Sequence, residues 1–214
     1  MRCQLLRCGV GNARTVACVL SMVSALFLLS DVALANEALS RPVLGFQQTL
    51  IAAMKDGADL GFAGRKSRMQ SLVDEHFDMP AITRAVIGRH YQQMEPAQRA
   101  ALSKRIHEFA ISTLASRFSR FDNERFLDPV VRVVNNDRAR LSSKFVQVDG
   151  DATDLTYDLS RVDERWRISN ISFGGVSGTS IQRAEFEVFL RSGGSASLLE
   201  KLDTLISEIE RDAK

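Results

Sequence analysis

The sequence predicts an α+β fold in which a four-stranded antiparallel sheet packs with helices that precede and follow it in the chain. Apolar residues recur with helical spacing over 36–126, alternate with polar residues over 127–176, and return to helical spacing over 177–214. Short turn sequences separate the alternating segments, so consecutive strands are expected to pair as hairpins. Because the chain contains no internal repeat, we expect a single domain with these three parts.

Residues 1–35 have the composition of a secretory signal peptide. Three arginines precede an apolar run over 16–29, and Ala33-Leu34-Ala35 offers the small-x-small pattern that signal peptidase cleaves. The apolar run is shorter than the roughly 20 residues that a membrane-spanning helix needs, and no later segment is longer. We therefore expect a cleaved leader, an exported chain without an integral membrane segment, and a periplasmic location.

Composition excludes several classes of function. All three cysteines, Cys3, Cys8 and Cys18, lie within the predicted leader, so the exported chain is expected to have no disulfides and no cysteine-ligated metal. Lys and Arg number 28 and Asp and Glu 26; the leader holds three of the former and one of the latter, so 25 of each remain. A chain with a net charge of about zero is a poor partner for nucleic acid.

Capping residues and glycines place the helices before residue 127. A first helix is expected to end in the glycine-rich stretch 56–65. Asp78 is placed to cap a later helix that has Pro80 in its first turn and Gly88 at its end. A long helix over about 96–121 carries two offset apolar stripes, which indicate that it buries a broad face.

The predicted sheet is a meander whose last strand is irregular. In that strand Trp166 and Ile168 share one face whereas Ile171 and Phe173 share the other, so a bulge is expected near Asn170 and would curve the sheet. The turns between the strands are expected at 135–137, 149–150 and 163–164.

Glycines also delimit the C-terminal helices. Gly174-Gly175 is expected to give a sharp turn at a rim where a ligand or partner approaches. A helix over 179–191 then stops at Gly193-Gly194, and Ser197 is expected to cap the last helix.

No cluster typical of catalysis or metal binding is visible. No two of His76, His90 and His107 have the spacing of a metal-binding pair. The stretch from Gly175 to Thr179 lacks the second glycine of a nucleophile elbow, so its hydroxyl groups are expected to cap the next helix, although glycines before a helix N-terminus can also cradle a phosphate. We expect no metal and no cofactor, and a cavity for an apolar ligand between the curved sheet and the helices.

Three segments of the chain carry a recognisable family pattern: HFDMPAITRAVIGRHY (76–91), EPAQRAALSKRIHEFAISTLASRFSRF (95–121) and WRISNISFGGVSGTSIQRAEFEVFLRSGGSASLLEKL (166–202). They resemble the MlaC family of periplasmic phospholipid-binding proteins, which includes toluene-tolerance auxiliary proteins and the hopanoid-associated HpnM branch. The chain departs from the usual family pattern at His90-Tyr91 and Gly178, and the pattern from Arg183 to Phe186 is similar to that of the HpnM branch, so hopanoids remain an alternative ligand class.

The resemblance implies an NTF2-like curved sheet that packs with helices around an apolar cavity for acyl chains. It implies a monomeric carrier, without enzymatic activity, that moves lipid between an inner-membrane ABC transporter complex and an outer-membrane lipoprotein complex. At family motif positions, the expected cavity wall consists of Phe77, Ile82, Val86, Tyr91, Phe109 and Trp166; from periodicity alone we add Phe118, Val133, Leu141, Phe145, Tyr157, Ile168 and Phe173.

Two other functions stay open from the sequence. NTF2-like pockets also serve isomerases and dehydratases, for which Asp158 and His90 are the candidate catalytic residues. A purely structural adaptor would have a filled core and no cavity.

Overall fold

The computed structural model describes residues 36–213, apart from the side chains of Val133 and Val134. The predicted signal peptide over 1–35 lies outside the described residues. Residues 36–55 are helical. The later elements are α2 (Gly57–His76), α3 (Met79–Ile87), the 3-10 helix η1 (Gly88–Gln93), α4 (Pro96–Arg117), β1 (Arg125–Phe126), β2 (Val130–Asn135), β3 (Arg138–Val146), β4 (Ala152–Val162), β5 (Arg165–Phe173), β6 (Val176–Ser177) and α5 (Gly178–Asp212).

The strands form one antiparallel sheet in the order β1-β3-β4-β5-β6, with β2 on the same edge of β3 as β1. This arrangement confirms the predicted α+β class, but the described sheet has six strands instead of four. β1 and β6 have two residues each, which is too short to produce a recognisable alternation of apolar and polar residues.

Turn chemistry and one bulge shape the sheet as the sequence predicts. Asp163 and Glu164 both have positive φ, as a two-residue type I′ hairpin turn requires. Asp158 pairs with Asn170 but Leu159 pairs with Ile168, so Ser169 is the extra residue of a bulge in β5. The predicted bulge near Asn170 is therefore confirmed.

Several predicted helix limits need correction. Helical structure resumes at Gly57, and within α2 only Gly61 has non-helical dihedral angles, with φ at 59°. The long helix ends at Arg117, before the predicted limit of 121. The break at Gly193-Gly194 is confirmed, but the residues after it are helical, so Ser197 lies within the helix and does not cap it.

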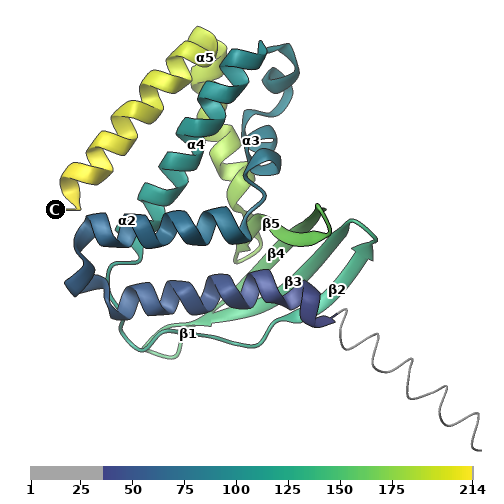
Figure 1. Ribbon diagram of the computed structural model, residues 1–214, viewed down its shortest axis with the longest axis vertical. Helices are drawn as coiled ribbons and strands as arrows, with labels where there is room; N and C mark the ends of the chain where they lie inside the picture. The colour runs from purple at the N-terminus through teal and green to yellow at the C-terminus, as the bar shows by residue number, and fades with distance from the viewer. Residues whose placement is uncertain (1–35, 214) are drawn as a thin grey trace, which may run out of the picture. The chain divides into compact units, whose positions relative to one another are not determined.

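The buried apolar side chains form two separate clusters. The sheet core joins residues of helix 36–55, α2, the C-terminal half of α4 and the inward face of the sheet; the helix core joins α3, the N-terminal half of α4 and α5 (Figure 1). α4 contributes to both because its two stripes face different clusters. Buried members of the sheet core include Leu50, Met69, Leu72, Val73, Ile111, Leu141, Tyr157 and Ile168; those of the helix core include Val86, Ile87, Leu102, Ile106, Phe186, Leu198 and Leu202.

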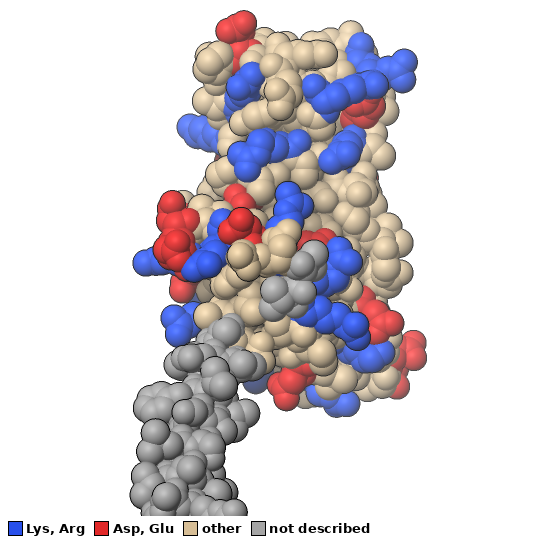
Figure 2. Space-filling model, turned by 90° about the vertical axis from the view of Figure 1, so that its right-hand side faces the viewer, with Lys and Arg blue, Asp and Glu red and all other residues tan. Residues whose placement is uncertain are grey.

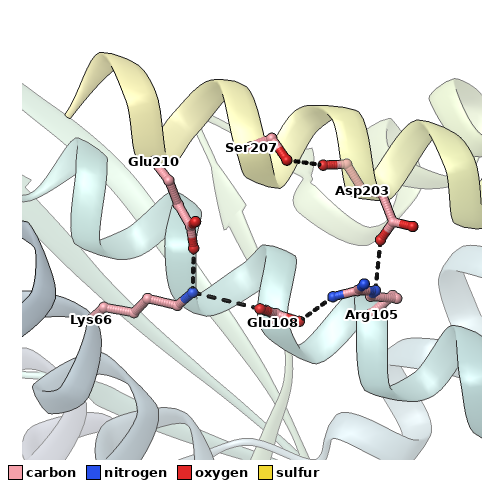
Figure 3. A network of polar contacts seen from close by, with 6 residues as sticks. All are labelled: Lys66, Arg105, Glu108, Asp203, Ser207 and Glu210. Atoms are coloured by element: carbon pink, nitrogen blue, oxygen red, sulfur yellow. Dashed lines mark hydrogen bonds and ion pairs between the residues drawn. The ribbon is translucent and has the colours of Figure 1, made fainter. Parts of the chain in front are cut away.

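Ion pairs join α2, α4 and α5 at the surface (Figure 3). Arg105 Nε lies 2.7 Å from Asp203 Oδ1, and its Nη1 lies 2.7 Å from Glu108 Oε2. Lys66 Nζ lies 2.5 Å from Glu210 Oε1 and 3.6 Å from Glu108 Oε1. One network of five charged side chains therefore connects a helix of the sheet core to both long helices of the helix core.

Candidate functional site

An apolar cleft of ≈ 230 Å³ lies between the sheet core and the helix core. Met79 packs against both cores and lines the cleft. The cleft is therefore the boundary between two packed bodies, not a void within either of them. Its walls comprise Val73, Phe77, Met79, Ile82, Val86, Ile106, Phe109, Ala110, Thr113, Leu114, Asn170, Ile171, Gly178, Thr179 and Gln182.

Asp78 fixes the start of α3, which forms one wall of the cleft. Its Oδ1 accepts a hydrogen bond from the Ala81 N–H at 2.9 Å, and its Oδ2 accepts one from Ser160 Oγ at 2.5 Å. The Asp78 N–H donates to the Ile168 carbonyl oxygen at 2.9 Å. These bonds confirm the predicted cap and attach the N-terminus of α3 to β4 and β5.

Helical spacing explains which side chains of α3 and α4 reach the cleft. In α3, Met79, Ile82 and Val86 lie three and four residues apart and share one face. In α4, the lining residues from Ile106 to Leu114 follow the spacing i, i+3, i+4, i+7 and i+8. Two amphipathic faces therefore supply most of the apolar surface.

Asn170 connects the bulge in β5 to the start of α5 at the polar rim of the cleft. Its Nδ2 donates to Asp158 Oδ2 at 3.0 Å. Its Oδ1 accepts from the Thr179 N–H at 3.1 Å, and from Thr179 Oγ1 and Ser177 Oγ at 3.0 Å each. Ser177 Oγ accepts in turn from the Ser180 N–H at 3.2 Å, so Ser177 is the cap of α5. The side chain of Asn170 therefore links β4 and the start of α5 by hydrogen bonds at this rim.

A family model described as MlaC protein matches residues 45–204, a span that runs from helix 36–55 past the break in α5. The chain belongs to the MlaC family. It is also similar to the solved structure of a phospholipid-binding protein from Ralstonia solanacearum in complex with a phospholipid, with 18% sequence identity and a TM-score of 0.66. That comparison covers 80% of this chain and 98% of the other chain. Because the identity is low, this likeness concerns the fold. No curated protein sequence matches the chain.

Membership of the MlaC family confirms the predicted resemblance, and the structure places four predicted wall residues in the cleft. Phe77, Ile82, Val86 and Phe109 line it, and all four stand at family motif positions. A fifth such residue, Tyr91, packs against the helix core, and its ring lies 5.0 Å from the Arg99 guanidinium carbon. The HpnM branch stays a prediction.

The predicted wall residues of the sheet lie elsewhere. Leu141, Tyr157 and Ile168 are completely buried within the sheet core, and the Tyr157 hydroxyl accepts a hydrogen bond from Gln47 Nε2 at 3.1 Å. Burial raises the pKa of Tyr157 to about 12, although the hydrogen bond from Gln47 acts in the opposite direction. These three side chains therefore belong to solid packing beside the cleft.

The remaining predicted wall residues also do not line the cleft. Phe118, Phe145 and Trp166 are partly buried and pack against the sheet core. Phe173 is 50% exposed at the end of β5. The side chain of Val133 lies outside the described residues.

Sequence reasoning missed part of the actual lining. Ile106 belongs to one of the two apolar stripes of the long helix, and Ile171 is expected on the same strand face as Phe173, the one predicted wall residue from that face. Val73 and Leu114 give no signal that separates them from ordinary core residues, because a helix buries core and cleft side chains with the same spacing.

The two candidate catalytic residues occupy different environments. Asp158 Oδ1 lies 2.7 Å from Arg140 Nε, and its Oδ2 accepts from Asn170. His90 Nε2, on η1, lies 3.0 Å from Glu187 Oε2 on α5. Each side chain is engaged by its own partner, and neither lines the apolar cleft.

Within the part of the chain that the structure describes, no group of three His, Cys, Asp or Glu side chains is placed to hold a metal ion. None of the helices over 36–213 combines the length and the apolarity needed to span a bilayer. Basic and acidic side chains are interspersed over the face shown in Figure 2, as expected from the near balance of charges.

Proposed function

We propose that this member of the MlaC family is a periplasmic lipid carrier that holds acyl chains in the cleft between its two cores. The observation that carries the proposal is the apolar lining of that cleft, which includes Phe77, Ile82, Val86 and Phe109. The fold shared with a phospholipid-binding protein in complex with a phospholipid supports it.

The energetics of lipid transfer favour such a carrier. Each buried methylene group contributes about 0.8 kcal/mol, so a 16-carbon chain left in water would cost on the order of 13 kcal/mol. An apolar cleft removes most of this cost while the lipid crosses an aqueous compartment. Because transfer between a bilayer and an equally apolar cleft is nearly neutral, its direction must come from the partners.

The size of the cleft implies a wider loaded form. Sites that enclose drug-sized ligands have volumes of about 300–1,000 Å³, whereas this cleft has ≈ 230 Å³. The two cores meet at the cleft and share Met79, but α4 contributes to both of them and Asp78 attaches the start of α3 to the sheet, so the cores are not free to separate as rigid bodies. We infer that lipid entry widens the cleft through shifts of the side chains that line it on α3 and α4.

The remaining features of the proposed carrier come from its predicted leader and from what membership of the family implies. The leader over 1–35 directs the chain to the periplasm as a monomer, where it exchanges phospholipid, or alternatively hopanoid, between an inner-membrane ABC transporter complex and an outer-membrane lipoprotein complex. No catalytic step is required of the carrier.

Native mass spectrometry of the protein purified from its own periplasm tests the proposal. We expect bound lipid in the wild type and a reduction of about tenfold or more in Ile82→Asp, because a carboxylate in the cleft wall would have to be buried against acyl chains. Val188→Asp is the matched control, since Val188 is 63% exposed on α5. A wild-type protein that carries no lipid would overturn the proposal.

A further inference from the structure

A polar pocket of ≈ 440 Å³ lies beside the apolar cleft and is bordered by a different face of α3. Ala81 and Ala85 of α3 face this pocket, whereas the residues that follow each of them face the cleft. Strands β3, β4 and β5 and the start of α5 form its other walls. Asn170 and Thr179 line both the pocket and the cleft, so the two sites meet at these residues.

The charges of the pocket do not balance. Arg138 and Arg140 line it, and Asp158 is the one acidic residue among its described lining. Both oxygens of Asp158 are occupied, one by Arg140 Nε at 2.7 Å and the other by Asn170 Nδ2 at 3.0 Å. Within residues 36–213, Arg138 forms no ion pair, so its positive charge remains uncompensated in the pocket.

A further positive charge, that of Arg132, lies beside the pocket in a position that destabilises the sheet. Arg132 of β2 stands directly opposite Arg140 of β3. Like charges at directly opposite positions of an antiparallel pair destabilise the sheet. A bound anion shared by these guanidinium groups would offset that repulsion.

The chemistry of the pocket suits a phosphate group. Arginine presents a planar set of N–H donors that matches phosphate oxygens in pairs. The N-terminus of α5, which begins at Gly178 beside the pocket, adds the partial positive charge of a helix dipole.

We propose that this pocket binds the phosphate of a lipid headgroup while the acyl chains of the same lipid occupy the cleft. The inference rests on the proposed carrier function and specifies its substrate class. One uncompensated positive charge favours a phosphodiester headgroup of net charge −1, such as phosphatidylglycerol, over a zwitterionic one. A hopanoid without a phosphate would gain no binding free energy from the pocket.

A competition experiment tests the preference. The protein is incubated with vesicles of equimolar phosphatidylglycerol and phosphatidylethanolamine with identical acyl chains, re-isolated, and its bound lipids are quantified by mass spectrometry. The wild type is expected to be enriched in phosphatidylglycerol, and the double variant Arg138→Gln/Arg140→Gln to lose about tenfold of that enrichment, which corresponds to about 1.4 kcal/mol. Lys144→Gln is the matched control, because Lys144 lies on the same strand but pairs with Asp154 at 2.6 Å outside the pocket.

The outcomes separate the two proposals. Lipid in both proteins at the same headgroup ratio would overturn the phosphate site and leave the carrier function intact. Vesicle lipid absent from every variant would refute the carrier function itself.

A titration with inorganic phosphate distinguishes a headgroup site from a site for free phosphate. We expect amide chemical shifts of Asn170 and Thr179 to respond in the wild type and not in the double variant. If inorganic phosphate binds but the headgroup ratio is unaffected by the substitutions, the pocket serves free phosphate and the lipid assignment is wrong.

Discussion

Replacing Asp78 with alanine tests how α3, and with it one wall of the cleft, is held on the sheet. The substitution removes the helix cap to the Ala81 N–H, which is typically worth about 1 kcal/mol. It also removes the acceptor of the Ser160 hydroxyl, and a lost hydrogen bond of this kind costs a further ~1–2 kcal/mol. Because Asp78 is only 5% exposed, water cannot fully replace these partners.

The free energy of unfolding should therefore fall by about 2–3 kcal/mol, which lowers the Tm by about 4–12 °C for a domain of this size. Urea unfolding followed by circular dichroism measures the first value and calorimetry the second. Asp78→Asn retains a capping oxygen and should lose less, and Ser160→Ala should lose about 1 kcal/mol. An Asp78→Ala protein whose stability lies within about 0.5 kcal/mol of the wild type would refute this account of α3.

Three further substitutions or titrations test single features. Burial lowers the pKa of His76 below its ordinary value of 6.5, with Glu75 opposing and Arg167 reinforcing the effect. The unfolded chain then binds the proton first, so the contribution of His76 to the free energy of unfolding should be constant above pH 6.5 and fall as the pH drops just below it. Urea titrations at several pH values should show that His76→Gln loses this part of the slope. A Cβ on Gly45 would lie 2.5 Å from His76 Cε1, so Gly45→Ala should lower the free energy of unfolding by about 1–3 kcal/mol, measured by thermal unfolding. The loss caused by Gly45→Ala should be smaller when His76→Ala is also present. Gly175 has φ at 82° with open space around it. Gly175→Val should therefore lower the free energy of unfolding by about 1–2 kcal/mol, and Gly175→Asn should lower it clearly less. Equal losses for the two variants would contradict the turn geometry as the reason for this glycine.

Local features of this fold follow from the sequence because their causes are local. The cap at Asp78, the hairpin turn at Asp163-Glu164 and the bulge beside Asn170 each depend on a few neighbouring residues. Gly174-Gly175 also takes the predicted sharp turn, with both φ angles positive. The sequence could not indicate β1 and β6, since pairing of two residues depends on where the neighbouring strand lies.

The cleft could be located only in part for a related reason. Periodicity identifies side chains that face inward, but it does not separate those that meet other side chains from those that meet a space. Tyr157 and Ile168 were therefore expected in the wall although they fill the sheet core, whereas Phe77 and Phe109, selected from motif positions, do line the cleft. Placing Leu114 in the wall needs the relative position of two cores, which is a tertiary property.

The charged network of Lys66, Arg105, Glu108, Asp203 and Glu210 has a practical consequence for handling the protein. Partial burial alone would raise the pKa of Glu108, but Arg105 and Lys66 together lower it, so the bridges that Glu108 forms persist in mildly acidic buffers. Dissolved salt is a stronger perturbation, because at 1 M the Debye length is about 3 Å and exposed charge pairs are largely screened. Elution of the protein in concentrated sodium chloride is therefore expected to weaken the contacts that this network makes among α2, α4 and α5.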